Sequence, residues 1–216
     1  RSSSARKRPD TASAERHMRR VDFFYGLGSR YSYLAATQID ALAARTGATF
    51  EWRPLFSGEL IARKGQSPFD GAPVSGQYDW TYRRRDAERW AAYYGVPYIE
   101  PAPFALPPAR YAAAAAAAAR WSRTREMSLA LFHAIFGTGR GVGDVEIAEA
   151  ARAAGLDPDA LLAQIEDGAA RAARNVADAA ALGAFGVPTF AFDGEIIWGN
   201  DRLVLLEHAL LQGTER

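Results

Sequence analysis

The chain of 216 residues has no cysteine and no long hydrophobic run. The absence of cysteine excludes a disulfide framework, a CxxC redox pair, a cysteine nucleophile and any cysteine-ligated metal or iron–sulfur cluster. No apolar stretch approaches the roughly 20 residues that a membrane-spanning helix requires. Because 26 Lys and Arg face 25 Asp and Glu, the net charge of +1 favours no nucleic-acid partner, although a local basic patch stays open. These absences predict a cytoplasmic globular protein with neither a membrane nor a nucleic-acid partner.

Histidine is scarce as well. His17, His133 and His208 lie far apart, and neither an HExxH motif nor a suitable carboxylate spacing accompanies them. The sequence therefore predicts no metal site and assigns these histidines to the surface or to packing.

Residues 1–20 are rich in Ser, Thr, Ala and Arg and show no hydrophobic periodicity, which predicts a disordered N-terminal extension. Without an apolar stretch before Val21, they do not match a secretory signal. The composition favours an extension ahead of a start at Met18 over an organellar transit peptide.

A β-branched and aromatic run at residues 21–25 predicts the first strand. Apolar side chains then recur at helical spacing from Tyr31 to Leu42, and Gly47 is a typical helix stop. A second strand is predicted over residues 49–55. A strand, a helix and a strand in this order make a βαβ unit, so we predict parallel neighbouring strands with a right-handed crossover.

The middle of the chain combines a loop with a helical block. Residues 57–76 are rich in Gly, Pro and Ser and predict a long loop, which in a compact domain is usually functional or mobile. Helical patterns dominate residues 79–182, with separate short helices predicted over 158–166 and 171–182. The alanine run at 112–119 is explained by high helix propensity and close helix approach.

The pattern changes again near the C-terminus. Residues 189–192 and 195–198 predict two strands joined by Asp193 and Gly194, a dipeptide typical of a β-hairpin. A closing helix is predicted to begin at residues 199–201.

Without its helical block, this order of elements has the connectivity of the thioredoxin fold. The predicted fold class is therefore α/β, a thioredoxin-like fold with a large all-helical insertion. The predicted thioredoxin-like domain comprises residues 21–56 and 171–214, and residues 57–170 form the loop and helical insertion.

Three junctions between predicted elements carry polar groups. The first holds Ser29, between a strand and the N-terminus of its helix. Helix-start N–H groups stabilise an anion, so the Ser29 hydroxyl can help hold a thiolate or oxyanion there. The alternative is an N-cap worth about 1 kcal/mol.

The second junction is Val187 and Pro188, at the entrance to a strand. A proline there removes a ladder donor and can adopt the cis form, which leaves the preceding backbone available to an extended ligand. The alternative is an ordinary loop-to-strand corner.

The third junction comprises Trp198, Gly199, Asn200 and Asp201, where a strand leads into the last helix. Helix-start N–H groups bind a carboxylate and Asp201 can pair with an amino group, a combination that suits an amino-acid headgroup. The alternative is a helix cap followed by a surface Arg202. The thioredoxin topology predicts that the three junctions converge.

These motifs, taken in order, resemble the 2-hydroxychromene-2-carboxylate isomerase family, which sits beside kappa-class glutathione transferases among DsbA-like thioredoxin-fold proteins. The likeness runs over nearly the whole folded chain, from about Val21 to Leu210. The segments that carry it are DFF at 22–24, GSRYSYLA at 28–35, RWA at 89–91, GVP at 95–97, FGVPTF at 185–190 and WGNDRL at 198–203.

The resemblance implies a glutathione-dependent cis–trans isomerase in the breakdown of aromatic hydrocarbons, with a small aromatic substrate and a homodimeric assembly. It also implies that Ser29 stands where thiol oxidoreductases have their redox cysteine and stabilises the glutathione thiolate, the reactive nucleophile. Addition of that thiolate to the ring-opened substrate would create a rotatable single bond, and elimination would restore the double bond as trans.

The resemblance further implies roles for individual residues. Val187 would pair through its backbone with the cysteinyl part of glutathione, with Pro188 cis, and the third junction would surround the γ-glutamyl end. Arg63 or Lys64 would meet the substrate carboxylate, and Phe104 lies where the family places an aromatic residue that usually carries a hydroxyl.

The sequence departs from the family at Arg30, where a proline usually follows the serine. Its charge beside the proposed thiolate would help to stabilise it or bind a different anion. Two alternatives to the isomerase stay open. One is a kappa-like glutathione transferase, and the other is a non-catalytic binding or chaperone module that uses the Val187–Pro188 edge for peptides.

Overall fold

The computed structural model describes residues 19–65, 75–101, 108–140 and 143–212. The strands are β1 (Arg20–Tyr25), β2 (Thr49–Pro54), β3 (Thr189–Phe192) and β4 (Glu195–Trp198). The α-helices are α1 (Arg30–Ala36), α2 (Ile39–Thr46), α3 (Ser57–Ala62), α4 (Trp80–Tyr94), α5 (Pro108–Ala117), α6 (Thr124–Phe132), α7 (Asp144–Ala153), α8 (Pro158–Leu162), α9 (Ile165–Ala181) and α10 (Leu203–Gln212). The 3₁₀-helices η1 (Gly76–Tyr78), η2 (Ala118–Trp121) and η4 (Asn200–Arg202) and the π-turn η3 (His133–Gly137) complete the order.

The four strands form one mixed sheet in the order β2-β1-β3-β4. As predicted, β1 and β2 are parallel neighbours, whereas β3 runs antiparallel to both β1 and β4. The hairpin has the predicted bounds because Asp193 and Gly194 both adopt positive φ, 53° and 80°, as its two-residue turn requires.

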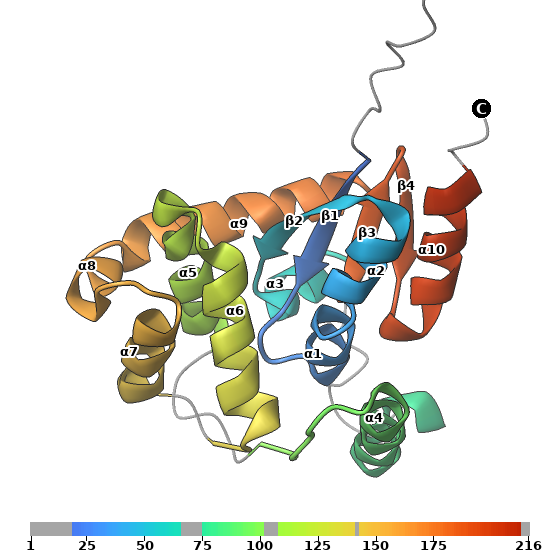
Figure 1. Cartoon of the computed structure of the whole chain (residues 1–216), viewed down its shortest axis with the longest axis horizontal. Helices are drawn as coiled ribbons and strands as arrows, with labels where there is room; N and C mark the ends of the chain where they lie inside the picture. Colours follow the sequence, from blue (N-terminus) through green and yellow to red (C-terminus); the bar gives the residue numbers. More distant parts are fainter. Residues whose placement is uncertain (1–18, 66–74, 102–107, 141–142, 213–216) are drawn as a thin grey trace, which may run out of the picture.

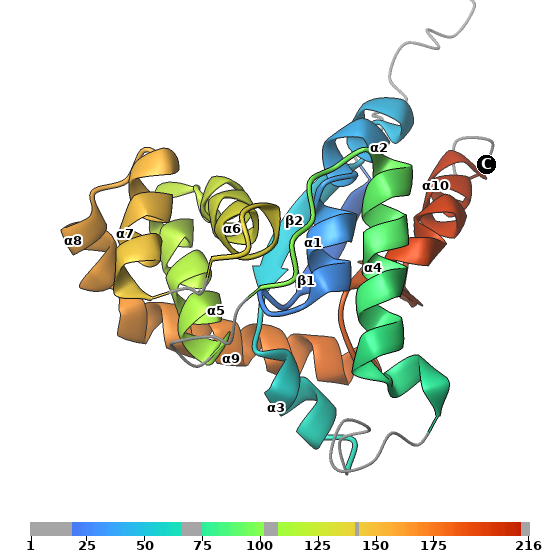
Figure 2. The same cartoon turned by 90° about the horizontal axis from the view of Figure 1, so that it is seen from below.

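Alternate residues of β1 face opposite layers of helices. Phe23 and Tyr25 point into the main core, which includes Leu34 of α1 and Leu206 of α10. Phe24 belongs instead to a second core cluster with residues of α3 and α9. The sheet is therefore covered by α1, α2 and α10 on one face and by α3 and α9 on the other (Figures 1 and 2).

Helices α5 to α8 form a block beside the sheet, and α9 runs from this block across to the strands (Figure 1). The alanines of α5 are buried, and α5 packs closely on α9. At the crossing, a Cβ on Gly168 would stand 2.1 Å from the carbonyl oxygen of Ala113. This contact confirms that the alanine run serves close helix approach.

The predicted first helix is two helices. Thr37 ends α1, and its hydroxyl donates to the carbonyl oxygen of Leu34 at 2.7 Å. Gln38 N–H bonds to Ala35 three residues back, and Ile39 begins α2. The apolar spacing continues across the break, so periodicity alone predicted one helix, but Gly47 ends α2 in the left-handed region as expected.

The prediction of an uninterrupted loop over residues 57–76 is also wrong, because α3 occupies its start. Leu60 is fully buried against the second core cluster, so tertiary packing stabilises a helix of six residues that local pattern does not indicate. The predicted short helices over residues 158–166 and 171–182 also have different bounds in the structure. Helix α8 ends at Leu162, and α9 is continuous from Ile165 to Ala181. The predicted domain boundary at residues 170 and 171 lies within α9.

Candidate functional site

Ser29 occupies the turn between the end of β1 and α1. Its hydroxyl oxygen accepts the backbone N–H of Ser32 at 3.2 Å, which confirms the N-cap interpretation, and its own N–H bonds to Gly26 at 3.0 Å. The side chain is half-buried. Among the described residues nothing accepts the hydroxyl proton, so capping leaves Ser29 able to donate a hydrogen bond to a ligand.

The second junction lies against this turn. The peptide bond between Val187 and Pro188 is cis. A Cβ on Gly26 would stand 3.5 Å from Cγ2 of Val187, so the turn before Ser29 and the cis-proline loop are in contact. Within the described part of the chain, the backbone N–H and C=O of Val187 make no hydrogen bond. They remain available to an extended ligand.

The third junction is hydrogen-bonded to the second. Gly199 N–H donates to the carbonyl oxygen of Pro188 at 3.0 Å, and Gly199 has a φ of 107°, a left-handed conformation that glycine adopts without strain. The indole of Trp198 lies beside Gly186, where an added Cβ would stand 2.9 Å from Nε1. The structure therefore brings all three junctions together.

Asn200 and Asp201 differ in their surroundings. Asn200 is 3% exposed, and its side-chain Nδ2 has no partner among the described residues. Its backbone carbonyl accepts the hydroxyl of Tyr94 at 3.1 Å. Asp201 is exposed and pairs with Arg202 at 2.8 Å. A buried amide without a partner is costly, so Nδ2 is a donor suited to an acceptor on a ligand.

Arg30, the departure from the family pattern, contacts a polar and aromatic cluster that includes Glu100 and Trp80. Its Nη2 pairs with Glu100 at 2.7 Å, and its guanidinium carbon lies 5.3 Å from the centre of the Trp80 ring. Tyr98 donates its hydroxyl to the other oxygen of Glu100. The sequence indicated Arg30 alone, because Glu100 and Trp80 reach it only through tertiary packing.

Arg83 and Asp86 of α4 extend this cluster. Arg83 lies over the ring of Tyr31 at 4.9 Å, and Tyr31 donates its hydroxyl to Asp86 at 2.8 Å. Burial raises the pKa of Tyr31, and the hydrogen bond to Asp86 raises it further, so the phenol stays protonated as a donor. Burial also lowers the pKa of the Arg83 guanidinium, and the charge of Arg30 acts in the same direction.

The predicted substrate residues are not gathered at the junctions. Arg63 caps the end of α3 and pairs with Glu59 of the same helix at 2.9 Å, and both Arg63 and Lys64 are exposed. Phe104 lies outside the described residues. Their proposed contacts with a substrate therefore stay predictions.

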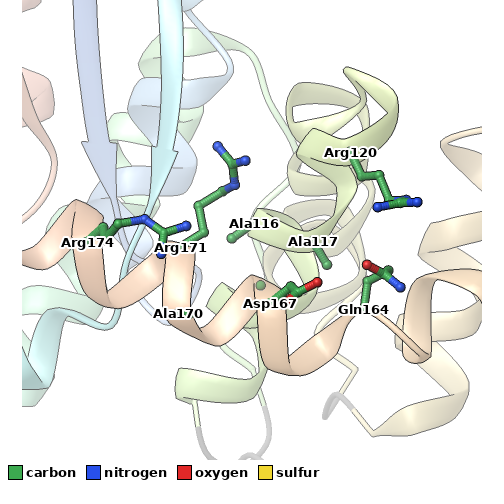
Figure 3. Close-up of a pocket in the computed structure, with 9 residues that line it drawn as sticks. Ala116, Ala117, Arg120, Gln164, Asp167, Ala170, Arg171 and Arg174 are labelled. Carbon is green, nitrogen blue, oxygen red and sulfur yellow. The ribbon is translucent and has the colours of Figure 1, made fainter.

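Two of the cavities lined by described residues differ in their relation to the three junctions. One, of about 280 Å³, lies between the end of α5 and α9, with Arg120 toward one end and Arg171 and Arg174 toward the other (Figure 3). It includes no residue of the three junctions. The other, of about 760 Å³, lies where α2, α4 and α10 meet and is lined in part by Asn200 and Asp201.

The described residues also lack two kinds of feature. Among them, no cluster of His, Cys, Asp and Glu is arranged to hold a metal ion. No helix among them combines the length and apolar character needed to cross a membrane.

Comparisons with known proteins agree with this arrangement. The family model of the DsbA-like thioredoxin domain matches residues 20–211. A 2-hydroxychromene-2-carboxylate isomerase of Sphingobium xenophagum is 35% identical over 195 residues, which cover 88% of this chain and 97% of that protein. One of Pseudomonas putida is 29% identical over 198 residues, 88% of this chain and 93% of that protein. A solved structure of selenomethionine 2-hydroxychromene-2-carboxylate isomerase matches with a TM-score of 0.74 and 27% identity, over 89% of this chain and 95% of that chain.

Proposed function

Because this chain belongs to the DsbA-like thioredoxin domain family and, within it, to the 2-hydroxychromene-2-carboxylate isomerases, we propose that it is a glutathione-dependent cis–trans isomerase of 2-hydroxychromene-2-carboxylate-type compounds in aromatic hydrocarbon degradation. The observation that carries this proposal is the convergence of Ser29, the cis-proline loop and the start of the last helix. Together they offer a hydroxyl donor, an open stretch of backbone and a buried amide donor.

The residues present fit a γ-glutamyl tripeptide. The unpaired N–H and C=O of Val187 are the groups that pair with a cysteinyl backbone laid alongside as an extra strand. Asn200 Nδ2 lacks an acceptor, and a γ-glutamyl carboxylate or carbonyl supplies one. Asp201 can attract the amino group at the same end.

Ser29 would then face the sulfur. Its hydroxyl proton has no acceptor among the described residues, so it can donate to the sulfur and favour the thiolate over the thiol. When bound, glutathione would supply a nucleophilic thiolate that adds reversibly to a conjugated double bond and so permits rotation about it. The chain's own task is to hold that sulfur deprotonated and oriented toward the substrate.

An absorbance assay of chromene carboxylate conversion, with and without glutathione, tests this proposal. We expect turnover only with glutathione, and Ser29→Ala should lower kcat on the order of 10²-fold, as removal of one donor to a developing anion does. Asp157→Ala is the matched control, because it removes a helix N-cap of α8 that lies within the helical block. Turnover without thiol, or a Ser29→Ala variant as fast as the wild type, would refute the mechanism.

The same assay separates the two alternative functions. Isomerisation leaves total glutathione unchanged, whereas a kappa-like transferase consumes it by conjugation. A non-catalytic peptide-binding module would show no glutathione-dependent rise in Tm but would respond to an extended peptide.

Assembly and location follow the same family reasoning. The proposed assembly is a homodimer, and sedimentation velocity tests it directly. It works in the cytoplasm, where the glutathione pool keeps thiols reduced, and fractionation of cells that produce it tests that location.

A further inference from the structure

The substrate named by the relatives carries a carboxylate, and the site therefore needs a cation near Ser29. Arg30 is the next residue along the chain, so its Cα lies about 3.8 Å from that of Ser29. Its side chain is 11% exposed and lies between α1 and α4, which run side by side in Figure 2. Arg63 and Lys64, by contrast, are exposed at the far end of α3.

The guanidinium of Arg30 has only part of its hydrogen-bonding capacity satisfied. Nη2 pairs with Glu100, but Nη1 is buried and has no partner among the described residues. A buried guanidinium nitrogen without an acceptor costs more than a neutral one, and an orphan of this kind in a native fold requires an explanation. A bound carboxylate supplies the missing acceptor, because the guanidinium fork matches carboxylate geometry.

Two carboxylates already accompany the guanidiniums of Arg30 and Arg83. Glu100 already accepts from both Arg30 and Tyr98, and Asp86 accepts from Tyr31. Arg83 brings a second guanidinium to the same indole, with the Trp80 ring 5.3 Å from Arg30 and 5.9 Å from Arg83. The two guanidiniums and the two carboxylates balance in charge, so an incoming carboxylate would be bound by the unmet hydrogen-bonding capacity of Arg30 Nη1 and not by an excess of positive charge.

We infer that Arg30 binds the carboxylate of the substrate through Nη1, with the ring of Trp80 alongside the aromatic part of the same molecule. This inference rests on the proposed function, and it replaces Arg63 and Lys64 as the carboxylate-binding residues. Trp80 is 57% exposed at the first residue of α4, and its ring centre lies 5.3 Å from the guanidinium carbon of Arg30. Arg30 is thus a specificity-determining residue that selects bicyclic aromatic carboxylates over their uncharged analogues.

Calorimetric binding of 2-naphthoate and of its methyl ester to the full chain tests the inference without requiring turnover. We expect Arg30→Gln to weaken 2-naphthoate at least tenfold and to leave the weaker binding of the ester unchanged. Glu100→Gln breaks the same ion pair but removes a competing carboxylate, so it should leave 2-naphthoate binding unchanged or tighten it. Arg110→Gln, which breaks the Arg110–Asp144 ion pair between α5 and α7, is the control and should leave binding unchanged.

A loss of 2-naphthoate affinity in Arg30→Gln but not in Glu100→Gln separates ligand binding from a structural role. If the ion pair only holds α1 against residues 98–100, both variants should weaken the acid and the ester alike, and the inference is overturned. It is also overturned if the wild type does not prefer the acid, or if Arg63→Gln or Lys64→Gln causes the loss instead.

If Arg30→Gln does not fold, Arg30→Lys keeps the charge, should remain folded and should weaken 2-naphthoate by a smaller factor. An unchanged affinity in that folded variant overturns the inference. Glutathione-dependent turnover of the wild type, measured separately, shows whether the proposed function itself stands.

Discussion

The hydroxyl of Tyr94 donates to the backbone carbonyl oxygen of Asn200 at 3.1 Å, which ties the end of α4 to the start of the last helix. Tyr94 lies in the segment predicted as insertion, whereas Asn200 lies in the predicted thioredoxin-like domain. The third junction of the candidate site is therefore held from both parts of the chain.

Tyr94→Phe tests how much the third junction depends on the hydrogen bond from Tyr94 to Asn200. The substitution removes one of two hydrogen bonds to the carbonyl oxygen of Asn200, which keeps the backbone N–H of Leu203, so we expect a loss of up to about 1 kcal/mol in the free energy of unfolding. Glutathione affinity should fall several-fold because the Asn200 backbone is then held by the Leu203 N–H alone. Urea unfolding and calorimetry measure the two effects. The matched control is Tyr93→Phe, because Tyr93 is 78% exposed, and equal losses in both variants would contradict the assignment.

Gly168→Ala tests the crossing of α5 and α9. In an isolated helix this change is stabilising by roughly 1 kcal/mol. In the protein, the new methyl group would stand 2.1 Å from the carbonyl oxygen of Ala113, a backbone atom that moves only if the helices separate. We expect the free energy of unfolding to fall by about 1–3 kcal/mol, measured by urea denaturation. A stabilised variant would show that the helices do not approach this closely.

Gly186→Ala probes the wall that Trp198 forms beside the cis-proline loop. An added methyl group would meet Nε1 of the indole at 2.9 Å, and this half-exposed ring can move aside. Stability should change by less than about 1 kcal/mol, while glutathione affinity falls because the ring no longer lines the third junction. Tryptophan fluorescence should report the ring displacement, and an unaltered glutathione affinity would remove Trp198 from the site.

Local sequence signals were sufficient for the strands and the junctions. The bounds of β3 and β4 follow from Asp193 and Gly194. Both residues adopt positive φ, and the two-residue turn that they form fixes the register of the hairpin. Ser29 and Val187 were identified because each stands where one element ends and another begins.

The parts that the sequence did not predict depend on long-range packing. Helix α3 is six residues long, and the burial of Leu60 against α9 stabilises it more than any local pattern does. The ion pair of Arg30 with Glu100 joins residues 70 apart in sequence, and neither residue type indicates the other. Side-chain partners of this kind follow from the docking of α4 on α1, which periodicity alone does not specify.

The buried phenol of Tyr25 makes stability depend on alkaline pH. Its hydroxyl contacts Oγ of Ser128 at 2.5 Å, and since Ser128 donates onward to Thr124, Tyr25 is the donor. Burial raises the pKa of Tyr25 well above its ordinary value of 10. The folded state therefore keeps this proton while the unfolded state loses it above pH 10, so its contribution to stability is complete below pH 10 and declines as the pH rises further.

Tyr25→Phe isolates this contribution. At pH 8 the variant should be less stable than the wild type by about 1 kcal/mol, because it lacks the hydrogen bond to Ser128. At pH 11 the wild type should have lost roughly 1.4 kcal/mol through Tyr25, so the two proteins should become nearly equal. The other tyrosines with raised pKa values are present in both proteins and cancel in the comparison; they are Tyr31, Tyr33, Tyr94 and Tyr98. Urea denaturation at both pH values measures the difference, and a gap that stays constant would mean that Tyr25 reaches solvent and ionises in the folded state.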